Sequence, residues 1–191
     1  MTTVARPAPP RPAIHPSQMG MWVFLATISM LFAAFTSAYI IRRVAADWVP
    51  IALPRILWLN TAILLGSSIF VELARKAVGG DEWSSAKRWL RTATLIGLAF
   101  LGGQMMAWRI LVAAGVFVPT SPHSSFFYIF TGVHGLHLLG GLLLLLWTTR
   151  RIGGPRPPVK VDARRWLDLA ATYWHFLGGL WVFLLLVLWA L

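Results

Sequence analysis

The sequence predicts an all-α integral membrane protein built as a single bundle of five transmembrane helices. Apolar residues make up 58% of the 191-residue chain and charged residues only 12%, about half of the charged fraction expected in a soluble domain. Five apolar stretches are also long enough to cross a hydrocarbon core, which takes about 20 residues. Because period-two alternation is missing, closed barrels are excluded and helices remain.

The expected spans and their boundaries follow from where the apolar stretches end. We expect spans at residues 20–42, 55–76, 89–114, 124–149 and 165–190, inside a membrane domain that covers residues 19–191. Residues 1–18 are rich in proline and alanine and predict an extended tail. Ser84 or Ser85 is a candidate cap for the third span, and Asp162 for the fifth. The segment RRIGGPRPPVKVDARR, with two glycines and three prolines, predicts a loop without helix.

The distribution of charge predicts the orientation and excludes a nucleic-acid partner. The net charge is +11, but the basic residues gather at the ends of the spans and not on one soluble face. With a cytoplasmic N-terminus, 13 of the 17 Lys and Arg residues fall on the inner side and 4 on the outer side. The positive-inside rule therefore predicts a multi-pass membrane protein with a cytoplasmic N-terminus and a C-terminus on the outer side. The absence of cysteine excludes disulfides and thiolate metal sites.

Three histidines lie inside predicted spans, where polar groups are costly and mark something specific. His134 and His175 have similar depths in neighbouring spans, which is the arrangement that a bis-histidine haem requires. The competing interpretation is that His134, His137 and His175 bond to carbonyls, tyrosine or one another and fix helix packing. The residues alone leave both interpretations open.

Other unusual residues in the spans have structural interpretations that compete with functional ones. Glu72 is either part of a proton relay or the partner of Lys76 one turn away. Arg109 is expected to extend to a phosphate or a carboxylate at the outer surface, and Gln104 to bond another helix. Trp174 and Trp181 lie on one face of the last span with Gly178 between them, which favours close packing against a neighbour. No nucleophile–base pair and no metal shell is apparent.

All five predicted spans resemble, in order, the helices of subunit III of the haem–copper terminal oxidases. FTGVHGLHLLGG resembles the family's TGxHGxHxxxG helix, and YWHF followed by Trp181 resembles its YWHFxxxxW helix. The segments GMWVFLATISMLFAAFTSAY, LPRILWLNTAILLGSS and GLAFLGGQMMAW resemble its other helices. Two departures stand out: Ile28 follows Thr27 where the family usually has a carboxylate, and Gly178 replaces a common aspartate. Relatives of full length have seven helices, of which this chain resembles the last five.

The resemblance implies a core subunit without a catalytic site, haem or metal of its own. Haem and copper are then expected in partner subunits, mainly subunit I, with subunit II and membrane phospholipids as further partners. The resemblance to bacterial forms also implies a bacterial inner membrane, which makes the outer side, with the C-terminus, periplasmic. The expected role is to support oxygen reduction and proton pumping by subunit I, in which case His134, His137 and His175 are packing residues. Cytochrome c oxidase is favoured over quinol oxidase and over an accessory subunit of nitric oxide reductase. From a different class, a stand-alone haem-b cytochrome is the alternative.

Overall fold

The computed structural model describes residues 15–154 and 159–190, and it confirms the five-helix prediction. The helices are α1 (Pro16–Arg42), α2 (Ile56–Gly79), α3 (Trp83–Ala113), α4 (Pro122–Ile152) and α5 (Lys160–Ala190), with a short 3₁₀ turn, η1 (Val118–Thr120), before α4. All five α-helices are long and apolar enough to cross a membrane. The described residues contain no β-strand.

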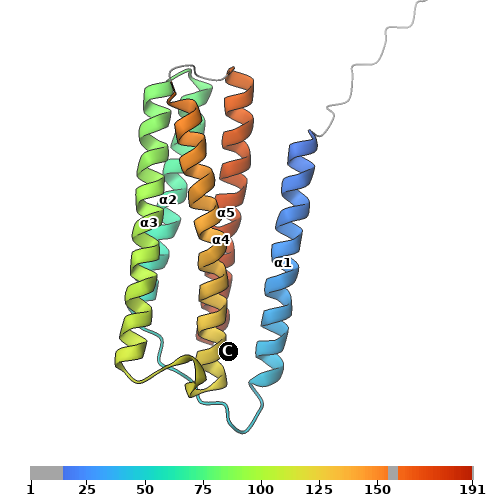
Figure 1. Cartoon of the computed structure of the whole chain (residues 1–191), viewed down its shortest axis with the longest axis vertical. Helices are drawn as coiled ribbons and strands as arrows, with labels where there is room; N and C mark the ends of the chain where they lie inside the picture. The colour runs from blue at the N-terminus through green and yellow to red at the C-terminus, as the bar shows by residue number, and fades with distance from the viewer. Residues whose placement is uncertain (1–14, 155–158, 191) are drawn as a thin grey trace, which may run out of the picture.

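The helices form a four-helix unit with one helix at its side (Figure 1). Helices α2, α3, α4 and α5 pack together, whereas α1 contacts only α4 and α5 within the described part of the chain. The contact that holds α1 is aromatic: Phe32 and Tyr39 are buried, and the Tyr39 ring lies 5.1 Å from Trp48 and 5.5 Å from Phe126. Helix α5 is the most buried of the five and forms the centre of the molecule.

Most of the helices are longer than the predicted spans, chiefly at the end where the basic residues gather. Helix α2 continues to Gly79, α3 begins at Trp83, α4 continues to Ile152 and α5 begins at Lys160. The expected caps are therefore wrong: Asp162 lies inside the first turn of α5, and Ser84 and Ser85 lie inside the first turn of α3. Hydropathy shows where the hydrocarbon core ends, but a helix continues past that point into the polar headgroup region.

The N-terminal boundary also differs from the prediction. Helix α1 begins at Pro16, so residues 16–18 are helical and not part of a tail. Proline is favoured in the first helical position because its missing N–H would have no helical partner there. His15 caps this end, accepting a hydrogen bond from the Ser17 backbone N–H at 3.4 Å. Residues 1–14 and 155–158, and with them Arg6, Arg11 and Arg156, lie outside the described residues.

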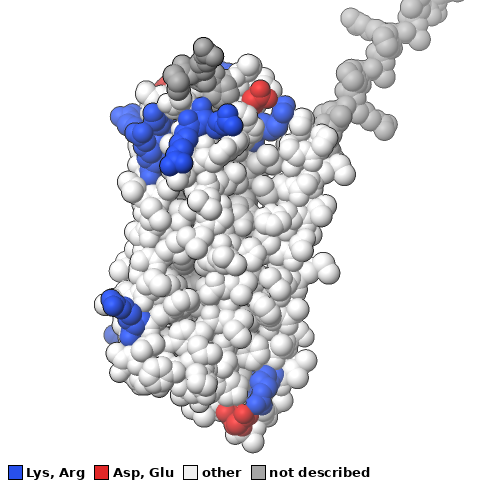
Figure 2. Space-filling view, viewed as in Figure 1, with Lys and Arg blue, Asp and Glu red and all other residues white. Residues whose placement is uncertain are grey.

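Basic side chains are concentrated at one end of the bundle (Figure 2). This end holds the C-terminal ends of α2 and α4 and the N-terminal ends of α1, α3 and α5. Its described Lys and Arg residues are Arg75, Lys76, Lys87, Arg88, Arg91, Arg150, Arg151, Lys160, Arg164 and Arg165. The opposite end carries Arg42, Arg43 and Arg55, with Arg109 less than two turns before the end of α3.

Candidate functional site: polar contacts between the helices

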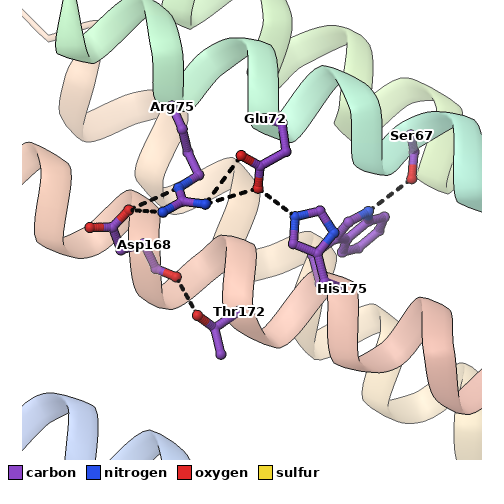
Figure 3. A network of polar contacts seen from close by, with 7 residues as sticks. Ser67, Glu72, Arg75, Asp168, Thr172 and His175 are labelled. Atoms are coloured by element: carbon purple, nitrogen blue, oxygen red, sulfur yellow. Dashed lines mark hydrogen bonds and ion pairs between the residues drawn. The ribbon is translucent and has the colours of Figure 1, made fainter.

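A network of charged residues joins α2 to α5 near the basic end (Figure 3). Arg75 lies between two carboxylates, with Nη1 2.9 Å from Glu72 Oε1 and Nη2 2.8 Å from Asp168 Oδ1. His175 Nε2 lies 2.7 Å from the same oxygen of Glu72 and therefore carries the proton of that hydrogen bond. Glu72 thus pairs with Arg75 and His175, whereas the sequence suggested Lys76, which is exposed. The network ties two helices together and leaves Glu72 and His175 partly accessible.

Trp174 is the side chain that brings the four-helix unit together. It is 1% exposed, and its Nε1–H donates to Ser67 Oγ on α2 at 2.8 Å. A Cβ atom added to Gly97 on α3 would lie 2.7 Å from the indole ring, and one added to Gly141 on α4 would lie 3.1 Å from it. The neighbouring helices therefore supply the small residues that admit this ring. Gly178, on α5 itself, faces Ser68 and Leu65 at ordinary contact distances.

A second tryptophan repeats this arrangement about two turns further along α5. Trp181 Nε1–H donates to Thr61 Oγ1 on α2 at 2.9 Å. Its ring lies 5.0 Å from Phe100 on α3, at nearly a right angle, and 5.2 Å from His134 on α4. The predicted stripe of Trp174 and Trp181 therefore packs against all three neighbours of the four-helix unit, and each indole N–H has a buried hydroxyl as its acceptor.

The three histidines of the spans have different surroundings. His134 is fully buried beside Trp181, and no described residue offers a hydrogen bond to either ring nitrogen. His137 Nδ1–H donates to the Val133 carbonyl at 2.8 Å, and its ring faces Phe32 of α1. His175, as described, bonds Glu72.

His134 and His175 do not face one another across a shared slot. His134 lies level with Trp181, which is six residues beyond His175 and therefore about 9 Å further along α5. The matching depth that sequence counting suggested is thus wrong, because α4 and α5 are offset along their axes. Within the described residues, no group of three or more His, Asp or Glu side chains is placed to hold a metal ion.

Sequence reasoning missed the role of His123, which it placed outside the spans. His123 is buried in the first turn of α4, where Nδ1 accepts the Ile51 backbone N–H at 3.0 Å. The proton of the neutral ring is then on Nε2, 3.4 Å from the Tyr39 hydroxyl, and the ring stacks on Trp48 at 5.1 Å. This histidine fixes the loop between α1 and α2. The only sequence signal near it is Pro122, which is typical of the first residue of a helix.

Gln104 lacks its expected hydrogen-bond partner, whereas the position of Arg109 agrees with the expectation. Gln104 is buried between helices as expected, but neither its oxygen nor its nitrogen has a hydrogen-bond partner among the described residues. Arg109 is exposed, less than two turns before the end of α3, and it forms no ion pair with a described residue. Its position suits a side chain that extends to the polar surface at this end of the bundle.

Comparison with known proteins shows which protein family this chain resembles. The sequence model of the family described as cytochrome c oxidase subunit III matches residues 13–191. "Cytochrome c oxidase subunit 3" of Thermostichus vulcanus is 31% identical, over 91% of this chain and 86% of the relative. The protein of the same name from Synechocystis is 30% identical over 93% of this chain and 77% of the relative. "Probable cytochrome c oxidase subunit 3" of Mycobacterium tuberculosis is 30% identical over 89% and 85%.

Proposed function

Because the chain belongs to the cytochrome c oxidase subunit III family, we propose that it packs on and stabilises the oxygen-reducing, proton-pumping subunit I. The chain is a subunit III of a respiratory haem–copper oxidase and a multi-pass membrane protein. The observation that carries the proposal is the family match across all five helices. The proposed partners are subunit I, subunit II and membrane phospholipids, and the proposed electron donor is cytochrome c.

The polar contacts between the helices support a structural role for this chain. The indole N–H groups of Trp174 and Trp181 on α5 each donate to a hydroxyl of α2, and His137 Nδ1–H donates to the Val133 carbonyl within α4. In the charged network, Arg75 pairs with Glu72 within α2 and with Asp168 of α5, and His175 of α5 bonds Glu72. We accordingly assign the haem and copper of the complex to the partner subunits.

Purification of the complex tests this function. A tag on the N-terminal tail should retrieve, in mild detergent, a large subunit whose reduced-minus-oxidised spectrum shows haem and whose metal content includes copper. The donor is tested on the same material by comparing oxygen uptake with reduced cytochrome c and with a quinol. Recovery of this chain alone, with a haem spectrum of its own, would contradict the proposal and restore the cytochrome alternative.

We place the basic end in the cytoplasm of a bacterial inner membrane, following the positive-inside rule. Because the chain has no cysteine, single cysteines can report this directly. Ser84→Cys lies at the basic end and Ala46→Cys at the other, and both positions are exposed. In whole cells, a membrane-impermeant maleimide should label Ala46→Cys and not Ser84→Cys; the reverse pattern would overturn the orientation.

A basic pocket supports the proposal that phospholipids bind this chain. Lys87 and Arg91 on α3 and Arg150 on α4 line a pocket of about 270 Å³ that has no carboxylate in its lining. None of the three forms an ion pair with a described residue, although the Lys87 ammonium donates to the Gly153 carbonyl at 3.1 Å. Basic pockets between helices on the cytoplasmic side suit anionic lipid head groups.

Charge-neutralising variants test the lipid contact. Replacing Lys87, Arg91 and Arg150 by glutamine should reduce the anionic phospholipid that co-purifies with the oxidase. Arg88→Gln is the matched control, because Arg88 is a neighbouring exposed cation that binds Ser85 and does not line the pocket. Equal loss of lipid in both variants would show that the pocket is not the binding site.

A further inference from the structure

Gln104 and His134 are buried polar side chains with unmet hydrogen-bonding groups. Gln104 is 2% exposed and His134 is fully buried. The oxygen and nitrogen of the Gln104 amide and both ring nitrogens of His134 have no hydrogen-bond partner among the described residues. Ser67, Thr61, Trp174 and Trp181 differ, since they bond one another or the backbone, and Asn60 is intermediate, with Nδ2 paired and Oδ1 unpaired among the described residues.

The two side chains lie at the same level on facing helices. Trp108 Nε1–H of α3 donates to Thr131 Oγ1 of α4 at 3.1 Å, which fixes the register between these helices. Gln104 lies one turn before Trp108, and His134 lies about one turn after Thr131. Helices α3 and α4 run in opposite directions. The step from Trp108 back to Gln104 and the step from Thr131 on to His134 therefore lead in the same direction along the bundle. The amide and the imidazole therefore belong to the same level of the α3–α4 interface.

Aromatic rings pack against His134 at this interface. The Phe100 ring, one turn before Gln104, lies 6.4 Å from the His134 ring, and the Trp181 ring lies 5.2 Å from it. Both rings are buried. The nearby Asn60 does not supply the missing partner, because its Nδ2 donates to the Phe100 carbonyl at 3.0 Å and its Oδ1 lies against Gly103.

The chemistry of the two groups matches a small ligand that both donates and accepts hydrogen bonds. A primary amide offers two donors and one acceptor oxygen, and a neutral imidazole offers one donor and one acceptor. Buried polar groups of this kind are almost always paired, and water is the usual partner where protein offers none. Water donates two hydrogen bonds and accepts two, so one molecule can bond the amide and the imidazole at once.

We propose that Gln104 and His134 bind an internal water molecule inside the four-helix unit. This water joins α3 to α4 by a hydrogen-bonded bridge one turn away from the direct Trp108–Thr131 bond. It gives a specific role to two polar residues that the packing contacts leave unexplained. The proposal does not depend on which electron donor or partner subunits the oxidase uses.

A density map of the complete oxidase that resolves ordered water tests the proposal. We expect a discrete peak within hydrogen-bond distance, about 2.6–3.2 Å, of both Gln104 and His134. Trp181 Nε1 and His137 Nδ1 are internal controls, because each already has a protein acceptor and should show no bridging peak. A direct Gln104–His134 hydrogen bond, or no peak between the two, would overturn the proposal.

A variant tests whether the density peak depends on the Gln104 amide. Gln104→Met has a similar length and removes both polar atoms of the amide, so the peak should be lost while the Trp108–Thr131 bond is kept. A peak that persists in Gln104→Met would also overturn the proposal, because the amide would then not hold the water. If this variant fails to assemble, the wild-type map alone decides.

Discussion

Adding a single methyl group at Gly97 should strongly destabilise the packing of this subunit. The new Cβ would lie 2.7 Å from the Trp174 ring and 2.7 Å from Leu142 Cδ2. Ordinary carbon contacts begin near 3.5 Å, so about 0.8 Å of displacement is required. The indole cannot simply retreat, since Ser67 holds its N–H at 2.8 Å and Gly141 lies close to its other side.

The expected cost can be set against a matched control on the same helix. Overpacking a well-filled core costs about 1–3 kcal/mol, reduced by the gain of up to about 1 kcal/mol when alanine replaces glycine in a helix. Gly102→Ala provides this gain alone, because a Cβ there meets nothing within 4 Å. The difference between the two variants should therefore reach about 1–3 kcal/mol.

The assay is the temperature at which the subunit is released from the purified oxidase in detergent, followed by gel electrophoresis of the soluble complex. We expect Gly97→Ala to be released at a lower temperature than wild type, and Gly102→Ala at the same temperature or a higher one. Equal release temperatures for the two variants would refute the argument that Trp174 is wedged against Gly97.

Four further predictions follow from other contacts. Ser67→Ala leaves the Trp174 N–H buried without an acceptor and should cost about 1–3 kcal/mol in the same release assay, whereas the partly exposed neighbour Ser68→Ala should be nearly neutral. Glu72→Gln should cost less than about 1 kcal/mol, because Glu72 and Arg75 are about 40% exposed; a large loss would show that the network is shielded in the complex. His123→Ala should free the α1–α2 loop, detected as faster tryptic cleavage after Arg43 or Arg55, and unchanged cleavage would argue against its role. Hydrophobic carbodiimide should not label α1, which contains no carboxylate, and peptide mapping that places label there would contradict the assignment of this helix.

The sequence was sufficient to predict the fold because hydropathy, helix length and charge at the helix ends all agree. The five spans and the concentration of basic residues at one end follow from these terms alone. The helix ends were less predictable, since Lys160 and Asp162 are polar and yet helical. A helix satisfies its own backbone hydrogen bonds in water and in lipid, so its end need not coincide with the edge of the apolar stretch.

The partners of the polar residues were not predictable from spacing along one helix. Lys76 follows Glu72 at a favourable distance. The contacts that Glu72 and Arg75 make are instead with His175 and Asp168, which are 103 and 93 residues away along the chain. The depth of His134 relative to His175 likewise depends on the offset between α4 and α5. This offset cannot be predicted from the sequence of either helix alone. Intrahelical spacing fixes which residues share a face, whereas packing between helices fixes which of them meet.

The position of Trp174 has a consequence for the timing of folding. This ring contacts Ser67, Gly97 and Gly141 on three helices that are all synthesised before it. Helix α5 also follows the other four helices along the chain, and it contacts α1, α2 and α4. Until it is inserted, the earlier helices present glycine and serine faces that no side chain fills. Packing of α2, α3 and α4 is therefore completed only after residue 174 has been synthesised, and a chain that stops short of this residue lacks the side chain that joins these three helices.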